Sequence, residues 1–253
     1  MTGLELGIVL VIGVAVGVVV GLLGAGGSIL TVPVLILLLG LTATEATGTS
    51  LVVVAIVSCV GLVTHARAGR VAWRAGLGFA ATGVPASVAG GYLAVLLSDV
   101  ALTLVLVALL LVTAPVMLRR GRREHLDVPA PAAPGWRRIL PSGLVVGLMT
   151  GTLGVGGGFA VVPALVGLLG LSMPVAIGTS QLVLAINAVA GLTGRLGTDA
   201  VVWSLGLVFA AGGAVGAVIA SRVVGRIDPA LLTRLFAGLL VLVAVSLLVE
   251  LAL

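Results

Sequence analysis

Seven long apolar runs, almost free of charged residues, limit what this chain can fold into. They cover residues 4–23, 44–64, 75–97, 99–118, 174–194, 201–224 and 229–252. A helix needs roughly 20 residues to cross the hydrocarbon core of a bilayer, so each run is long enough to span it. Charged residues make up only 8% of the chain, too few to cover the surface of a soluble protein. The sequence therefore predicts an all-α, polytopic membrane protein.

A glycine-rich motif occurs twice in the chain. Residues 21–33 read GLLGAGGSILTVP, and residues 151–163 read GTLGVGGGFAVVP. An offset of 130 residues aligns the chain with itself without a gap from Gly13 to Trp73, and sixteen of the thirty-one positions 21–51 are identical to their counterparts. The sequence is therefore a tandem duplication. We expect a first transmembrane repeat over residues 1–118 and a second over residues 139–253.

The segment between the repeats, residues 119–138, is rich in arginine and proline. It holds six of the thirteen arginines, and this composition predicts a solvated connection without regular structure. The positive-inside rule places it in the cytoplasm. Counting spans from there puts loop 65–74 inside and its counterpart, loop 195–200, outside, so the two repeats are predicted to be inverted. His65 ends a span beside arginines, and a position at the membrane interface is favoured over a role as a proton carrier.

An inverted duplication requires the motif segment to return to the side from which it entered. Residues 28–40 are too few to span a bilayer as a helix. Pro33 and Pro163 disfavour helix at the preceding residue and suit the first turn of a short helix. Each repeat is thus expected to contain a broken or re-entrant glycine-rich element, followed by a short helix, together with about four membrane helices. Whether the element is a re-entrant loop or the tip of a broken hairpin stays open.

The two glycine-rich elements are the first candidates for a binding site. Irregular backbone inside a membrane is tolerated only where protein or a water-filled cavity satisfies it, and exposed N–H groups at a helix start favour an anion. Two such elements from inverted repeats form the usual site of a secondary transporter. Lining of a site or gate is favoured over helix packing for Gly24, Gly26, Gly27, Gly154, Gly156 and Gly157. Packing is favoured for the fourfold-spaced glycines Gly13, Gly17, Gly21, Gly143, Gly147 and Gly151.

Polar residues at the start of the following span are the second group of candidates. The hydroxyls of Thr49, Ser50, Thr179 and Ser180 either bond back to their own helix or line the site. Gln181 and Asn187 carry more donors than their own helix can satisfy, and Asn187 shares a helix face with Ser180. Thr42 and Glu45 have the spacing of a capping box at a helix start.

Several classes of protein are not favoured by these residues. Cys59 is alone, so the chain has neither a disulfide framework nor a Cys/His set with metal spacing. The eight acidic residues and two histidines form no catalytic cluster. The basic residues lie in loops beside spans, a pattern unlike that of a nucleic-acid-binding domain. We expect no enzyme activity, no cofactor, no bound metal and no nucleic acid.

At these residues the chain resembles the sulfite exporter TauE/SafE family of prokaryotic membrane transporters, also called the sulfonate-uptake permease family. The resemblance rests on the duplicated G-x-G-G followed by a proline, the Gly-Thr-Ser start of the next span, the loop before Trp73 and the arginine-rich linker. It implies a secondary transporter that moves small sulfur-containing anions, such as sulfite, thiosulfate or organosulfonates, across the plasma membrane by alternating access.

The same resemblance implies the lining residues. They are Gly24, Gly26, Gly27, Thr49, Ser50, Gly154, Gly156, Gly157, Thr179 and Ser180. Ser28 of the first copy is replaced by Gly158 in the second, so the two repeats need not contribute equally.

Two alternative functions stay open: an anion channel, and a membrane scaffold that transports nothing. The expected partners are a small anion, the lipid bilayer and a coupling ion, either a proton or sodium. The sequence leaves the direction of transport and the oligomeric state open.

Overall fold

The computed structural model describes residues 3–24, 28–94, 107–108, 111–112, 114–115, 118–119, 135–153, 158–193 and 201–252. Within these ranges every regular element is a helix, as predicted. The helices are α1 (Gly3–Leu23), α2 (Ser28–Leu39), α3 (Ala43–Arg67), α4 (Trp73–Ala94), α6 (Trp136–Leu153), α7 (Gly158–Gly167), α8 (Met173–Thr193), α9 (Trp203–Val224) and α10 (Pro229–Ala252).

Six of these helices coincide with predicted spans: α1, α3, α4, α8, α9 and α10. The remaining predicted span, residues 99–118, falls largely outside the described residues. Four helices in the described part of the chain are long and apolar enough to cross a membrane, over Leu6–Leu23, Gly48–Arg67, Met173–Leu192 and Trp203–Val224. Large apolar side chains such as Val11, Leu207 and Val215 are exposed on these helices. This outer surface suits contact with lipid.

The glycine-rich motifs are each followed by a short helix, α2 of 12 residues and α7 of 10 residues. At 1.5 Å per residue both are shorter than about 20 Å, too short to cross a bilayer. Their starts differ from the prediction, because Pro33 and Pro163 lie inside the helices, five residues after the first helical residue. Each proline removes one intrahelical hydrogen bond. Packing of the apolar side chains of α2 and α7 into the core outweighs that local preference.

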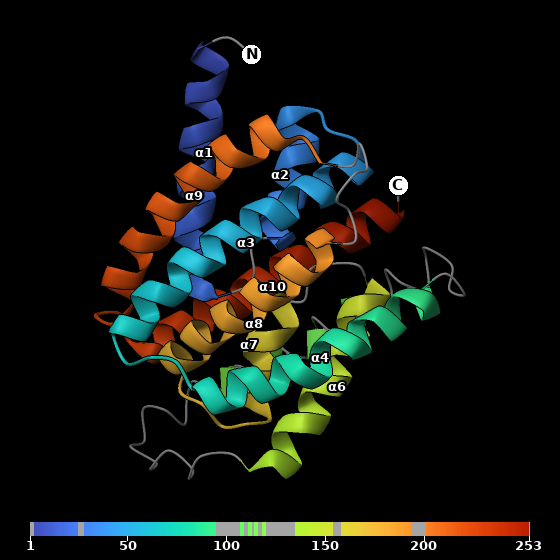
Figure 1. Cartoon of the computed structure of the whole chain (residues 1–253), viewed down its shortest axis with the longest axis vertical. Helices are drawn as coiled ribbons and strands as arrows, with labels where there is room; N and C mark the ends of the chain where they lie inside the picture. Colours follow the sequence, from blue (N-terminus) through green and yellow to red (C-terminus); the bar gives the residue numbers. More distant parts are fainter. Residues whose placement is uncertain are drawn as a thin grey trace.

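The two halves of the chain interlock through their fourth helices. Helix α9 runs along α1, and α4 runs along α6 (Figure 1). A Cβ atom on Gly17 would overlap the backbone of Gly213, and one on Gly147 would overlap the backbone of Gly83. Both pairs are related by the offset of 130 residues. Glycine is therefore required wherever these helix backbones touch.

The predicted packing role of the fourfold-spaced glycines is confirmed for five of the six. Cβ atoms built on them would meet atoms of the facing helix at 3.0 Å or less; these glycines are Gly13, Gly17, Gly21, Gly143 and Gly147. The surroundings of Gly151 lie outside the described part of the chain.

The core of the protein follows the same interlocked arrangement. One cluster of buried apolar side chains joins α1, α2 and α3 with α9, and a second joins α6, α7 and α8 with α4 and α10. Between them, α3 and α8 pack against each other through a small cluster that includes Val54 and Leu184. The α3–α8 interface is therefore where the two halves meet at the centre of the fold (Figure 1).

Candidate functional site

Gly24, the first glycine of the G-x-G-G part of the first motif, follows α1 directly and lies beside the other half of the chain. Its backbone φ is +62°, a left-handed conformation that favours glycine. The backbone N–H of Gly24 donates to the carbonyl of Val20 at 2.8 Å. A Cβ atom here would lie 2.8 Å from Ser180 Oγ and 3.0 Å from Ile177 Cα. Both the backbone conformation and the close approach of α8 therefore require glycine.

Ser180, the last residue of the second Gly-Thr-Ser triplet, contacts this turn directly. Its Oγ lies 3.1 Å from the carbonyl oxygen of Gly24 and 2.7 Å from that of Ile177. One hydroxyl therefore has two carbonyl acceptors, one in its own helix and one in the motif of the other half. The bond back to its own helix, one of the two predicted roles of this hydroxyl, is thus present, and lining of a binding site stays a prediction.

Thr49 and Thr179 hold the starts of the fourth helices. The backbone N–H of Val202, at the start of α9, donates to Thr49 Oγ1 at 3.0 Å. The backbone N–H of Ala72, just before α4, donates to Thr179 Oγ1 at 2.9 Å. The first N–H groups of a helix have no partner within it, so each threonine acts as a cap from the opposite half of the chain.

The amide side chains predicted to need partners beyond their own helix are those of Gln181, which is fully buried, and Asn187, which is partly buried. Neither side-chain amide atom of Gln181 has a hydrogen-bond partner among the described residues, and Asn187 Oδ1 is also unpartnered. Buried polar atoms are rarely left in this state. These two amides are therefore available to bind a polar ligand along α8.

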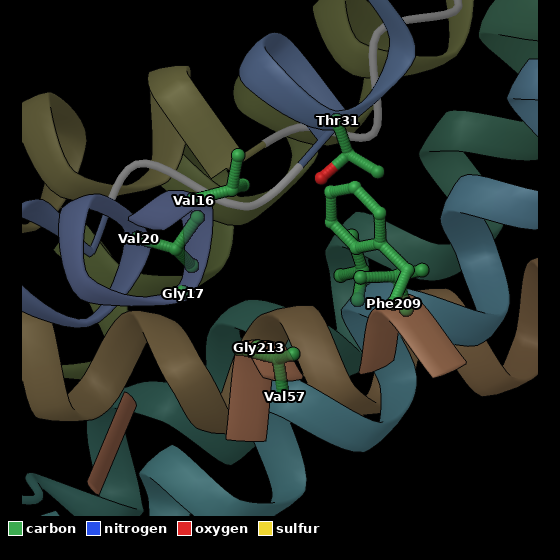
Figure 2. A pocket seen from close by; sticks show the side chains of 9 residues that line it. Val16, Gly17, Val20, Thr31, Val57, Phe209 and Gly213 are labelled. Carbon is green, nitrogen blue, oxygen red and sulfur yellow. The ribbon is translucent and has the colours of Figure 1, made fainter. Parts of the chain in front are cut away.

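A small cavity lies between α1, α2, α3 and α9, next to the first motif. Its volume is about 10 Å³, room for about one water molecule. The lining is apolar except for Thr31, whose Oγ1 is buried and unpartnered among the described residues. Figure 2 shows the Thr31 hydroxyl directed toward the interior, above the ring of Phe209. Val57 lines this cavity at the position equivalent to Asn187.

His65 lies in the last turn of α3, and the structure buries it completely. Neither ring nitrogen has a hydrogen-bond partner among the described residues. Helix α8 covers the side chain, with Gly178 in contact. His65 also lies two residues from the end of the candidate span Gly48–Arg67, so its expected position at the membrane interface stays a prediction. Arg70 follows on the next turn, where its guanidinium donates to the carbonyl of Ser221 at 3.3 Å and lies against Gly225.

The structure thus brings part of the predicted site together and leaves part of it untested. Gly24, Thr49, Ser50, Thr179, Ser180 and Gln181 are buried at or near the contact between the halves. Ser28 and Gly158 begin α2 and α7. Gly26, Gly27, Gly154, Gly156 and Gly157 lie outside the described residues. His65 and Thr31 were missed, since their burial depends on helices distant in sequence.

Comparison with known proteins identifies the family. The family model described as "Sulfite exporter TauE/SafE" matches residues 9–247, nearly the whole chain. The chain belongs to the sulfite exporter TauE/SafE family. A "Probable membrane transporter protein" of Xylella fastidiosa strain Temecula1 is 31% identical over 91% of this chain and 90% of its own length. "Probable membrane transporter protein YdhB" of Bacillus subtilis strain 168 is 30% identical over 71% of this chain and 74% of its own length.

A more distant relative is archaeal. "Probable membrane transporter protein MJ0441" of Methanocaldococcus jannaschii is 25% identical over 81% of this chain and 78% of its own length. No solved structure matches the chain significantly. As a TauE/SafE family member, the protein is a membrane transporter. The hydrogen bond from Ser180 to the Gly24 carbonyl joins the glycine-rich motif of one half to the Gly-Thr-Ser triplet of the other.

Proposed function

We propose that this protein is a secondary transporter of small sulfur-containing anions, such as sulfite, thiosulfate or organosulfonates, across the plasma membrane. The two halves are inverted repeats that rock about their central contact, giving one site access to either side. The glycine-rich elements are re-entrant and carry the backbone N–H groups that bind the anion.

One observation carries this proposal: the bond between Ser180 and the Gly24 carbonyl, which ties the motif of one half to α8 of the other. Alternating access requires the two halves to move relative to each other around a bound substrate. A polar contact between the first motif and the triplet of the opposite half lies where such a movement would be transmitted. The unpartnered amide of Gln181 follows directly after Ser180 and supplies donors for an oxyanion.

The glycine-rich elements supply a further argument. Helices α2 and α7 are too short to cross the membrane, and each follows its motif directly. A short helix starting inside the membrane directs its unbonded N–H groups and the positive end of its dipole toward the motif. An anion can bind there without an arginine at the bilayer centre, where the cost is about 2.5 to 3.5 kcal/mol or more.

Counterflow in proteoliposomes tests the proposal. Vesicles preloaded with unlabelled thiosulfate should take up radiolabelled thiosulfate, and Ser180→Ala should slow this exchange by about threefold to tenfold, the value of one hydrogen bond. Ser142→Ala is the matched control, since Ser142 is also a buried serine that bonds back to its own helix, at the carbonyl of Arg138. A channel would show flux along the gradient without counterflow. Absence of exchange with thiosulfate, sulfite and sulfoacetate would overturn the proposal.

A further inference from the structure

Two fully buried polar side chains lie on adjoining turns of the interface between α3 and α8. His65 comes from α3 and Gln181 from α8. Both ring nitrogens of His65 and both amide atoms of Gln181 are unpartnered among the described residues. Well over nine in ten buried polar groups in proteins have a partner. Two such side chains on facing helices indicate a candidate binding site for a polar ligand.

Glycines on the two helices make room for these side chains reciprocally. A Cβ atom on Gly61 would lie 3.2 Å from Nε2 of Gln181, and one on Gly178 would lie 3.1 Å from the Cβ of His65. Gly61 and His65 are one turn apart on α3, and Gly178 and Gln181 are one turn apart on α8. Each polar side chain therefore lies against a glycine of the other helix, on adjoining turns of one interface.

Arginines are the charged residues that neighbour His65 along the chain. Helix α8 contains no charged residue. The charged residues next to His65 are Arg67, which is exposed, and Arg70, whose backbone N–H donates to the His65 carbonyl at 2.9 Å. Arg74 of α4 lies over the ring of Trp136, and Arg222 of α9 is exposed. No acidic side chain of the described residues forms an ion pair with His65.

This arrangement links proton and anion binding. A protonated imidazole at this place is a buried charge without a counterion, which costs free energy. A small anion entering the same place alone pays a similar cost. When both bind, the charge of a monoanion is neutralised and that of a dianion such as thiosulfate is halved. Each therefore strengthens the binding of the other, and this coupling is reciprocal. The amide of Gln181 can donate to the anion at the same time.

The duplicated sequence places a different pair at the equivalent positions of the other half. Arg195 corresponds to His65, and Leu51 corresponds to Gln181. One half thus carries a permanent positive charge where the other carries a group that gains charge only when it binds a proton. Of His65 and Arg195, the titratable residue is His65, and it is the one whose interface also carries an unpartnered amide, that of Gln181.

We propose that His65 and Gln181 form a subsite that binds one small oxyanion together with one proton and so couples anion transport to protons. The proton binds to a ring nitrogen of His65, an N–H group of the resulting imidazolium and the Gln181 amide then donate to the anion, and the proton leaves with the anion on the other side. This inference rests on the proposed transport function and names its coupling ion.

Thiosulfate uptake into proteoliposomes tests the subsite, with the membrane potential clamped to zero. Thiosulfate stays fully ionised between about pH 5.5 and about pH 8, so an effect of pH on its transport arises in the protein. With one coupled proton, an acidic exterior should accumulate thiosulfate about tenfold per unit of pH difference. His65→Gln should slow exchange and remove its dependence on pH. Gln181→Leu, which installs the residue of the other half, should raise the half-saturating concentration and keep the pH dependence.

The outcomes separate this inference from the proposed function. Thiosulfate exchange without accumulation under a proton gradient would overturn the subsite and leave the transporter in place. If His65→Gln folds and exchanges thiosulfate more slowly than the wild type by the same factor at about pH 5.5 and at about pH 8, His65 has a structural role only and the inference is overturned. If His65→Gln does not fold, an unchanged half-saturating concentration in Gln181→Leu would overturn it instead. Ser142→Ala should match the wild type throughout, and no exchange by the wild type would overturn both proposals.

Discussion

The two halves of this protein agree in their backbone contacts and differ in their buried polar side chains. Gly17 lies against Gly213, and Gly147 lies against Gly83 in the same way. Thr49 accepts a hydrogen bond from the backbone at the start of α9, and Thr179 accepts one from the residue before α4. A left-handed glycine, Gly40, follows α2 directly, and its counterpart Gly170 lies three residues after the end of α7. In contrast, the polar positions are unlike: Thr31 is matched by Val161, Asn187 by Val57, Gln181 by Leu51 and His65 by Arg195.

This difference distinguishes residues that hold the helices together from residues that are available for binding. Close helix packing and capping depend on residues with few substitutes, because a glycine has no Cβ and a cap needs an acceptor at a set distance. Those residues are therefore kept in both copies. A single site at the centre, however, needs its donors and its titratable group only once. The polar differences gather along α3, α8 and the neighbouring α2, which surround the contact between the halves.

The largest effect is expected from the glycines at the crossed helices. Gly17→Val places a branched side chain against the backbone of Gly213, which can move only if α1 and α9 separate. The fold should lose about 3 kcal/mol or more, and thermal unfolding in detergent should show it. Gly147→Val should have an equal effect at the other crossing, whereas Gly238→Ala, with nothing within 4 Å of the added Cβ, should not lower the melting temperature. Unequal effects of the two valine variants would mean that the crossings are not equivalent.

The capping threonines should give an intermediate and again equal effect. Thr49→Val and Thr179→Val keep the shape of the side chain but leave the N–H of Val202 or Ala72 without its acceptor. Each should destabilise the protein by about 1 to 3 kcal/mol in chemical or thermal unfolding. Thr49→Ser and Thr179→Ser retain the acceptor and should recover most of the loss. A neutral valine variant would show that the helix start is satisfied in another way.

Much of this framework could be predicted from the sequence because it depends on local rules. Apolar runs of spanning length gave six helices, fourfold glycine spacing gave the packing surfaces, and the Thr42–Glu45 spacing gave a capping box that the structure confirms. The exchange of α4 and α9 between the halves could not be predicted, because apolar helix faces do not specify their partners.

The candidate site was predicted less completely. Its glycine and Gly-Thr-Ser residues are marked by repetition in the sequence. The burial of His65 depends on Gly178, more than a hundred residues away, and no pattern around His65 signals that contact. The start of α2 ahead of Pro33 likewise reflects packing against α3, which local proline rules do not include.

The smallest expected effect comes from the capping box, which only the first half possesses. Glu45 accepts hydrogen bonds from the backbone N–H and the hydroxyl of Thr42 at 2.9 and 2.8 Å, and these bonds hold the pKa of its carboxyl below the usual 4.5. The second half has Ser172 and Val175 at the equivalent positions. Because the folded state lowers this pKa, its contribution to stability is complete above the unfolded value of 4.5 and is lost as the pH falls through the lower folded value.

Glu45→Gln tests the predicted direction of this pH dependence. The variant should melt slightly below the wild type at neutral pH, and the difference should disappear in acid, where Glu45 is protonated in both states. Val175→Glu builds the corresponding box behind Ser172 and should introduce the same pH dependence in the second half. A gap between Glu45→Gln and the wild type that stays constant on acidification would assign the effect of Glu45 to packing at the start of α3 rather than to its charge.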